Sequence, residues 1–292
     1  MTRVAWRVRN RALTLDRPLI MGILNVTPDS FSDGGRFFSP DKALAHARAL
    51  AAEGADIIDV GGESTRPHGA VAVSEQEEKR RVVPVITEIA RTLPELTISV
   101  DTVKASVAAA ALDAGAHIVN DVSAFRLDPH MGEICAEAGA GVVLMHSRGN
   151  VTEMGTYMHA SYDSFLRDVL SELRDRVAVA RHKGVPASAI AIDPGIGFAK
   201  RGEHSLRILA AIPELVAWGH PVVVGVSRKR FVGEISEVKG VEERLYGTIG
   251  ANVAALDRGA RIFRVHDVAP HRQALDVAWA IARPDTPTGA GT

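Results

Sequence analysis

Polar and charged side chains stand at the ends of a series of short apolar stretches, and their types define the chemistry open to the chain. In chain order these end residues are Asn25, Asp59, Asp101, Asn120, Met145, His146, Asp193, Ser227, Lys229, Arg264 and His266. The apolar stretches predict buried parallel strands, whose carboxyl ends meet at one face of a domain. We therefore expect these side chains to converge on one active site.

The converging side chains fall into two chemical groups. Asp101, Asn120 and Asp193 offer carboxylate and amide oxygens from separate strands, which suits the edge of a planar heterocycle rich in N–H donors. A second group is cationic and suits a phosphate or carboxylate; its members are Arg66, Lys229, Arg264 and His266.

Alternation along a strand predicts which of these side chains point together. Because alternate residues face the same side, we expect Ser227 to point with Lys229, and Arg264 to point with His266. A zinc site is not expected, because His146 and His266 have no third His or Cys ligand in a recognisable spacing.

A repeated pattern predicts the elements that position these residues. Four segments begin with Gly-Ala and run into a short apolar burst; they start at Gly54, Gly115, Gly139 and Gly259. Each follows an Ala-rich stretch, so the glycine fits a helix C-terminus and the burst fits a buried strand. Further strands are expected at Leu19–Val26, Thr97–Val100, Ile190–Asp193 and Pro221–Val226. Helices are expected at Pro40–Glu53, Ser74–Arg91, Val103–Ala114, Pro129–Ala138, Tyr162–Lys183, Ser205–Ala217, Glu242–Arg258 and Pro270–Ala282.

Eight alternating strand–helix units predict an α/β fold of the (β/α)8 TIM-barrel type. A doubly wound open sheet is the alternative, and the lack of a Gly-x-Gly-x-x-Gly after the first strand argues against it. The alternation of Val4, Trp6 and Val8 predicts a short strand or hairpin before the barrel. We expect an N-terminal extension at 1–18, one barrel domain at 19–282 and a flexible tail at 283–292.

Composition limits the classes of protein that this chain can represent. Of its 292 residues 46% are hydrophobic and 24% are charged, as in ordinary globular proteins. The net charge of −1 gives no overall field for nucleic acid or an anionic membrane. Cys135 is the sole cysteine, which excludes an intrachain disulfide. Arginines and Asn10 interrupt the first segment, so a secretory signal is not expected and the protein is expected to be cytoplasmic.

Seven motifs at the strand ends form a collinear set between about Leu19 and Ala282. They are Asn25-Val-Thr-Pro-Asp-Ser-Phe-Ser-Asp-Gly-Gly35, Gly61-Gly-Glu-Ser-Thr-Arg-Pro67, Ser99-Val-Asp-Thr102, Asn120-Asp-Val-Ser123, Asp193-Pro-Gly-Ile-Gly-Phe198, Ser227-Arg-Lys229 and Arg264-Val-His-Asp-Val268. This set resembles the dihydropteroate synthase family. The resemblance implies a cytoplasmic, homodimeric transferase of folate biosynthesis that is a target of sulfonamides. It implies the condensation of 6-hydroxymethyl-7,8-dihydropterin diphosphate with 4-aminobenzoate, giving 7,8-dihydropteroate and diphosphate.

The resemblance also implies a role for each matching residue. The implied ligands of the pterin diphosphate are Thr65, Asp101, Asn120, Met145, Asp193, Lys229, Arg264 and His266. The implied 4-aminobenzoate pocket comprises Phe31, Thr65, Arg66, Pro67, Phe198 and Ser227. Asn25 is implied to ligate Mg²⁺. Substrate oxygens and water complete the octahedral coordination of the ion. The implied catalytic residues are Asp101, Lys229, Arg264 and His266; they act by positioning and by stabilising the leaving diphosphate rather than as nucleophiles.

One residue departs from the family pattern. The family commonly reads Arg-Pro-Gly in the second loop, whereas His68 separates Pro67 from Gly69 here. The extra residue is expected to affect the aminobenzoate pocket and the response to sulfonamides, and to leave the pterin chemistry in place.

Two other functions are open to a pterin-binding barrel. One is a methyltransferase that moves a methyl group from methyltetrahydrofolate to a corrinoid protein. It needs no diphosphate site, so Ser227-Arg-Lys229 and Arg264-Val-His266 argue against it. The other is a non-catalytic pterin-binding paralogue, which would lack some of the catalytic residues at the strand ends.

Overall fold

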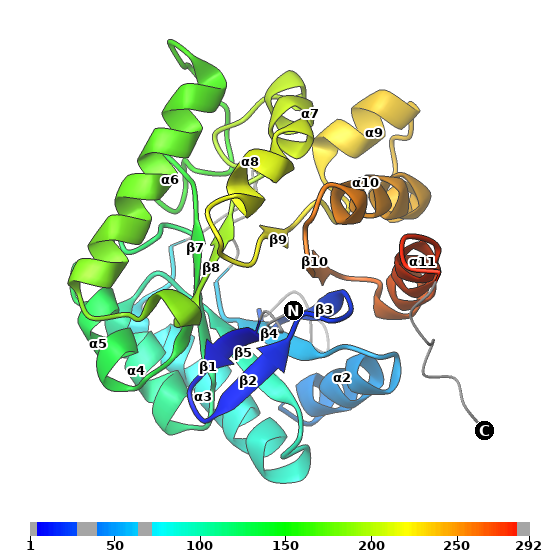
Figure 1. The fold of residues 1–292 in the computed structure, drawn as a ribbon. Coiled ribbons are helices and arrows are strands. Elements are labelled where there is room, and N and C mark those ends of the chain that lie inside the picture. The colour runs from blue at the N-terminus through cyan, green and yellow to red at the C-terminus, as the bar shows by residue number, and fades with distance from the viewer. Residues whose placement is uncertain (1–4, 28–39, 64–71, 285–292) are drawn as a thin grey trace.

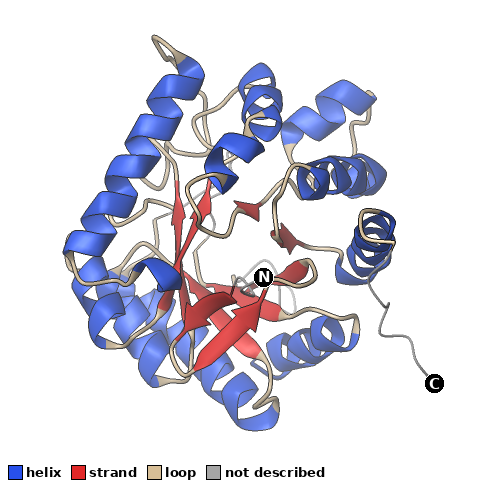
Figure 2. Ribbon diagram, in the orientation of Figure 1, coloured by secondary structure: helices blue, strands red, loops and turns tan. Residues whose placement is uncertain are grey.

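The computed structural model describes residues 5–27, 40–63 and 72–284, and an eight-stranded parallel sheet lies at its centre (Figures 1 and 2). The strand order is β8-β7-β6-β5-β4-β3-β10-β9, so every strand lies beside its neighbours in the chain and the first barrel strand pairs with the last. A parallel bridge between Ile192 and Val222 joins β8 to the segment that leads into β9. The predicted (β/α)8 fold is confirmed.

The barrel strands are short and almost wholly buried. They are β3 (Leu19–Asn25), β4 (Ile57–Gly61), β5 (Thr97–Asp101), β6 (Ile118–Asp121), β7 (Gly141–Met145), β8 (Ile190–Asp193), β9 (Val223–Val224) and β10 (Ile262–Val265). All eight lie where the sequence predicts strands. β9 is shorter than the predicted Pro221–Val226, because the ladder with β10 joins only Val223 and Val224.

An outer layer of helices covers the sheet (Figure 2). These helices are α2 (Pro40–Ala52), α3 (Glu75–Thr92), α4 (Ala105–Asp113), α5 (Met131–Glu137), α6 (Phe165–His182), α7 (Gly202–Ala210), α8 (Ile212–Val216), α9 (Arg230–Ser236), α10 (Leu245–Asp257) and α11 (Val268–Ile281), with 3-10 turns η1 (Ala187–Ala189) and η2 (Glu242–Arg244). The predicted helix Ser205–Ala217 is wrong as one element. It divides into α7 and α8 where Pro213, which lacks an N–H, begins a new helix. Helix α9 was not predicted from the sequence.

The predicted N-terminal hairpin is confirmed, and it packs against the amino-terminal end of the barrel. β1 (Ala5–Val8) and β2 (Arg11–Thr14) pair antiparallel. Trp6 is fully buried and donates through Nε1 to the Ala189 carbonyl at 2.9 Å. Val8 packs so closely that a Cβ on Gly141 would lie 2.4 Å from it, which explains a glycine at the start of β7. The hairpin thus closes one end of the barrel.

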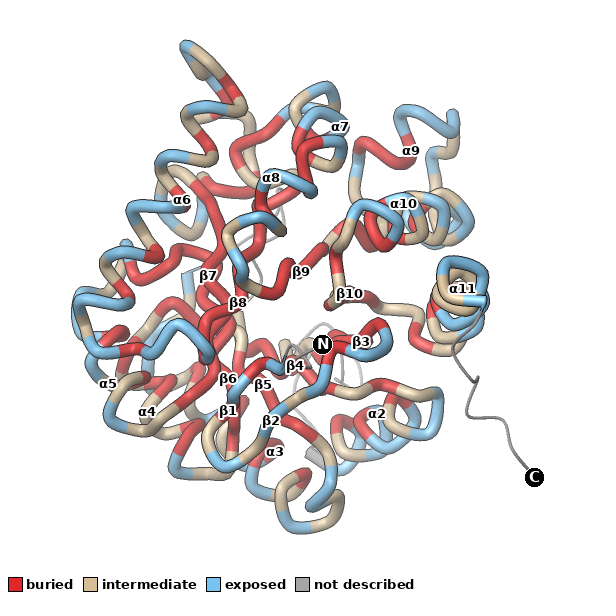
Figure 3. Tube along the Cα trace, viewed as in Figure 1, coloured by how far each residue is buried: buried red, intermediate tan, exposed pale blue. Residues whose placement is uncertain are grey.

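Buried residues occupy both the barrel strands and the sides of the helices that pack on them (Figure 3). Helix α3 shows how the sequence builds this layer. Ser74 caps it by accepting from the Glu77 N–H at 3.2 Å, and Val82, Ile86 and Ile89 form its buried stripe. None of the described helices is long and apolar enough to cross a membrane.

Candidate active site

The strand register brings the predicted site residues side by side at the carboxyl ends. Asn25 pairs with Gly61, Gly61 with Asp101, and Asp101 with Asn120. Across the barrel, Met145 at the end of β7 pairs with Asp193 at the end of β8. The predicted convergence on one mouth of the barrel is therefore confirmed for these residues.

An ion-pair network joins the ends of four strands. The Arg264 guanidinium donates through Nε to Asp59 Oδ2 at 2.7 Å and through Nη2 to Asp101 Oδ2 at 2.6 Å. Asn120 donates through Nδ2 to the same Asp59 oxygen at 3.1 Å. The expectation of separate anionic and cationic groups is therefore wrong for Arg264, because this cation lies between two carboxylates.

Burial controls the electrostatics of this network. Burial raises the pKa of Asp101 to about 7, against the effect of Arg264, and the charge of Asp59 adds to the rise. Asp59 is completely buried, and its Oδ1 has no hydrogen-bond partner among the described residues. An unpartnered buried acceptor is costly, so the network is best completed by a donor that a ligand or water supplies.

The buried Asp193 and the half-buried Lys229 influence each other electrostatically. Asp193 Oδ1 accepts from the Gly195 N–H at 2.7 Å. Burial raises the pKa of Asp193, and the charge of Lys229 is the first influence that opposes this rise. Burial also lowers the pKa of Lys229 to about 8, with Asp193 opposing and Arg264 adding to the decrease. The Lys229 ammonium donates to the Ile196 carbonyl and lies 4.4 Å from the centre of the Phe198 ring.

The segment from 227 to 229 does not follow the alternation that the sequence suggests. β9 ends at Val224, Arg228 has a left-handed φ of 58°, and Lys229 stands at the N-cap of α9. The expectation that a strand makes Ser227 and Lys229 point together is therefore wrong. Instead, Ser227 Oγ lies 2.9 Å from His266 Nδ1 and accepts from the His266 N–H at 3.2 Å.

Arg228 braces this turn. It reaches Asp267 through Nε at 3.0 Å and through Nη2 at 2.6 Å, and it pairs with Glu242 at 2.5 Å. No role of Arg228 was predicted from the sequence. The left-handed backbone turns Arg228 away from the direction that strand alternation would give it, so local sequence carries no signal for this contact.

An apolar wall borders the polar ends. Met145 is buried with Val103, Val122 and Met154, and Phe198 packs against this cluster. Such a surface is suited to the face of a flat ring, while the carboxylates and amide nearby suit its edge.

Several predicted site residues lie outside the described part of the chain. They are Phe31, Thr65, Arg66 and Pro67, together with His68 and the glycines of the first loop, Gly34 and Gly35. Their roles stay predictions.

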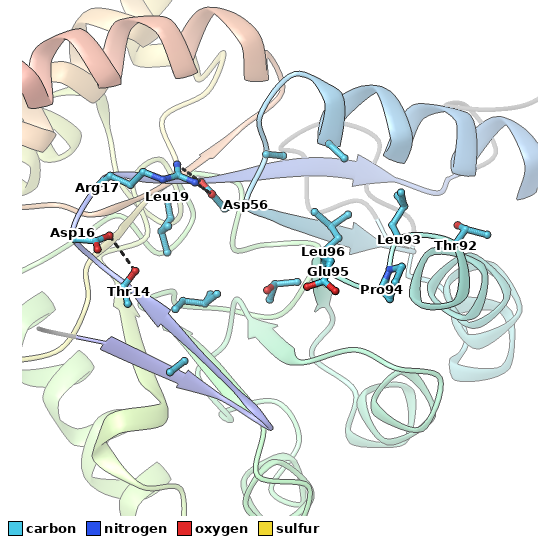
Figure 4. A pocket seen from close by; sticks show the side chains of 15 residues that line it. Thr14, Asp16, Arg17, Leu19, Asp56, Thr92, Leu93, Pro94, Glu95 and Leu96 are labelled. Carbon is cyan, nitrogen blue, oxygen red and sulfur yellow. Dashed lines mark hydrogen bonds and ion pairs between the residues drawn. The ribbon is translucent and has the colours of Figure 1, made fainter. Parts of the chain in front are cut away.

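A hollow of about 620 Å³ lies at the opposite end of the barrel, bordered by the hairpin and β3 (Figure 4). Three of its charged or polar lining side chains, Arg17, Asp56 and Asp16, have partners within the protein. Arg17 reaches Asp56 at 2.5 Å, Arg272 reaches the same carboxylate at 3.3 Å, and Thr14 donates to Asp16 at 3.0 Å. This end of a barrel usually serves stability, and the convergent chemistry lies at the other end.

Comparison with known proteins agrees with this geometry. Residues 21–266 match the family model described as pterin binding enzyme. The dihydropteroate synthase of Mycobacterium leprae is 46% identical over 272 residues, covering 91% of this chain and 94% of that protein. The chain spans about half the length of the bifunctional folate synthesis proteins of Arabidopsis thaliana and Pisum sativum that it also matches.

Solved structures give the same result. The Xanthomonas albilineans dihydropteroate synthase with 4-aminobenzoic acid aligns with a TM-score of 0.89 at 44% identity, covering 98% of this chain and 100% of that one. The Yersinia pestis enzyme in complex with a sulfonamide drug aligns with a TM-score of 0.88 at 39% identity, covering 96% and 100%.

A parallel barrel with carboxylate, amide and guanidinium groups at its mouth, matched over residues 21–266, places the chain in the pterin-binding enzyme family. Within that family its function is that of a dihydropteroate synthase, which is a transferase activity.

Proposed function

We propose that the described strand ends divide the work of this transferase as follows. Asp101, Asn120 and Asp193 hold the N–H edge of the pterin, and Met145 contacts the face of its ring. The observation that supports this assignment is the convergence of three oxygen-bearing side chains from β5, β6 and β8 beside one guanidinium. A carboxylate beside N–H donors makes charge-assisted hydrogen bonds, which are stronger than neutral ones.

Arg264 and His266 serve the leaving diphosphate in this proposal. As the bond between the pterin methylene carbon and the diphosphate oxygen breaks, negative charge collects on that oxygen. A guanidinium already fixed by two carboxylates does not have to reorganise to meet this charge. His266 is oriented by the Ser227 hydroxyl, which lies 2.9 Å from its Nδ1.

The arylamine of 4-aminobenzoate is the nucleophile in this scheme. Its nitrogen bonds to the methylene carbon and then gives up a proton, so no side chain needs to form a covalent intermediate. Phe198 and Ser227 line its pocket, with Phe31, Thr65, Arg66 and Pro67 completing it. Lys229 lies 4.4 Å from the centre of the Phe198 ring; burial lowers its pKa, and the charge of Asp193 opposes this decrease. Both observations support a position of Lys229 between the two substrates. Sulfonamides of the shape of 4-aminobenzoate would occupy the same pocket.

The residues at the ends of β3 and β5 fit Mg²⁺. A Cβ on Gly61 would lie 3.7 Å from Asn25 Oδ1 and 3.8 Å from Asp101 Oδ2, so two hard oxygen donors border one small space. No group of three or more His, Cys, Asp or Glu side chains in the described ranges could hold a metal. Mg²⁺ accepts few protein ligands when phosphate oxygens and water are present. When bound, it would neutralise charge on the diphosphate, and Asn25 would hold it.

A homodimer is the proposed assembly, formed through the outer faces of α10 and α11. Tyr246 on α10 is 84% exposed, and Val277 and Ile281 on α11 are 61% and 75% exposed. Exposed apolar side chains on two neighbouring helices are typical of a protein–protein interface.

Diphosphate release by the purified protein tests the proposed function. With the pterin diphosphate and Mg²⁺ present, we expect release to depend on 4-aminobenzoate and to yield dihydropteroate in equal amount. A methyltransferase would instead consume methyltetrahydrofolate in the presence of a corrinoid acceptor. A non-catalytic paralogue would bind the pterin and release nothing.

A further inference from the structure

Lys200 is a lysine whose position the proposed chemistry does not explain. It stands after the loop that leaves β8, yet it is only 1% exposed. Its Nζ lies 2.7 Å from His146 Nδ1, 3.0 Å from the Phe198 carbonyl and 3.5 Å from the His146 carbonyl. Within the described ranges no ion pair joins it to a carboxylate. Burial lowers the pKa of Lys200 well below its usual value. A buried amino group costs free energy unless its hydrogen bonds are satisfied, so a lysine here has a specific task.

The imidazole beside Lys200 is held in one state. His146 Nε2 lies 3.1 Å from Glu172 Oε2, and Arg148 in turn pairs with Glu172. Burial lowers the pKa of His146 to about 4, so the ring is neutral near pH 7. With Nε2 donating to the Glu172 carboxylate, Nδ1 has a lone pair that accepts an N–H of the Lys200 amino group.

The loop from 194 to 199 has a backbone that needs an anchor. Gly195, Gly197 and Ala199 have φ values of 67°, 78° and 46°. A Cβ on Gly195 would lie 1.9 Å from the His146 carbonyl oxygen, so the loop passes directly against the end of β7. A non-glycine residue in the left-handed region costs free energy, and surrounding contacts must hold the loop in this shape.

This loop supplies two of the contacts around Lys229. The Ile196 carbonyl accepts a hydrogen bond from the Lys229 ammonium, and the Phe198 ring faces the same group at 4.4 Å. Lys200 follows the loop in the chain. Its Nζ donates to the Phe198 carbonyl and also contacts His146, the residue after β7.

We propose that Lys200 is a positioning residue for the transferase reaction. Its buried amino group ties the end of β7 to the 194–199 loop through hydrogen bonds, and so fixes Phe198 and the Ile196 carbonyl around Lys229. The inference rests on the proposed function, which places Phe198 in the aminobenzoate pocket and Lys229 between the two substrates.

Lys200→Met tests this role, because it keeps an unbranched apolar stem and removes the amino group. We expect KM for 4-aminobenzoate to rise about tenfold and kcat to fall by a similar factor, as for the loss of one or two buried hydrogen bonds. KM for the pterin diphosphate should rise less, since Asp101 and Asn120 belong to other strands and only Met145 and Asp193 adjoin the segments that Lys200 joins. Lys200→Gln keeps N–H donors in a side chain of similar size, so its KM for 4-aminobenzoate should rise less than that of Lys200→Met.

Ile86→Ala is the matched control, since it opens a cavity in the fully buried stripe of α3, away from the loop. It should lower Tm and leave both KM values unchanged. If Lys200→Met lowers Tm while both KM values and kcat stay at the wild-type level, Lys200 only supports the fold and the inference is overturned. If Lys200→Met does not fold, Lys200→Gln takes its place. A Lys200→Gln protein with an altered Tm but unchanged KM values and kcat overturns the inference, and one with a raised KM for 4-aminobenzoate supports it. A wild-type protein without aminobenzoate-dependent diphosphate release overturns the proposed function itself, which is a different result.

Discussion

Replacement of Arg264 separates a catalytic guanidinium from a structural brace. In Arg264→Ala two buried carboxylates, Asp59 and Asp101, lose their shared cation at 2.7 and 2.6 Å. Breaking a buried ion pair from one side costs about 3–5 kcal/mol of folding free energy. Loss of one preorganised donor to a developing charge lowers kcat by roughly 10²–10³, which is about 3–4 kcal/mol in the transition state. We therefore expect both a lower Tm and a much lower kcat.

The contacts of Arg264 also predict how its variants rank in stability and activity. Arg264→Lys has one ammonium and cannot donate along two directions to Asp59 and Asp101 together, so it should be impaired but less unstable than Arg264→Ala. KM for 4-aminobenzoate should move little in either variant, because the amine does not touch this guanidinium in the proposed arrangement. His266→Ala should lower kcat in the same direction and combine with Arg264→Ala less than additively, since both serve one charge.

The assay measures kcat, both KM values and Tm on the same preparations, well below the lowest Tm. Arg261→Ala is the matched control. It removes an arginine that precedes β10, where Arg261 donates to the Leu256 and Ala260 carbonyls, far along the strand from the site. Arg261→Ala should lower Tm and leave kcat and both KM values unchanged. A folded Arg264→Ala protein with nearly normal kcat would refute the catalytic reasoning and leave Arg264 as a brace of the barrel.

The remaining predictions concern the pterin anchor, the effect of pH and the assembly. Asp193→Asn should weaken pterin binding by roughly 2–3 kcal/mol, the scale of a hydrogen bond to a charged group; calorimetry with unchanged affinity would remove Asp193 from that role. The pKa of Asp101 is raised from 3.8 to about 7 on folding, so its contribution to stability is complete below pH 4 and is lost as the pH rises towards 7. Asp101→Asn should remove this part of the slope in denaturant unfolding between pH 4 and 8, and an unaltered slope would contradict the assignment. Tyr246→Glu should shift the protein to monomer in light scattering, whereas Met158→Glu, at another apolar residue 69% exposed, should leave the dimer intact.

The order and kind of elements followed from local sequence. Gly-Ala before a short apolar run marks a helix end and a buried strand, and both signals act over a few residues. Strands therefore appear where predicted, and the register then sets Asn25, Gly61, Asp101 and Asn120 beside one another. The motifs at those ends carried the family resemblance, since a parallel barrel presents every strand end at the same mouth.

The partners of the site residues depended on contacts that join distant parts of the chain. Arg264 and Asp59 are 205 residues apart, and strand alternation shows that they face the mouth without showing that they pair. Lys200 and His146 meet only because the loop after β8 turns back against β7 through left-handed residues. Sequence periodicity determines which side of an element a residue faces. The closure of the barrel decides which buried charges meet, because in a water-poor interior each charge needs a partner that only the packed fold supplies.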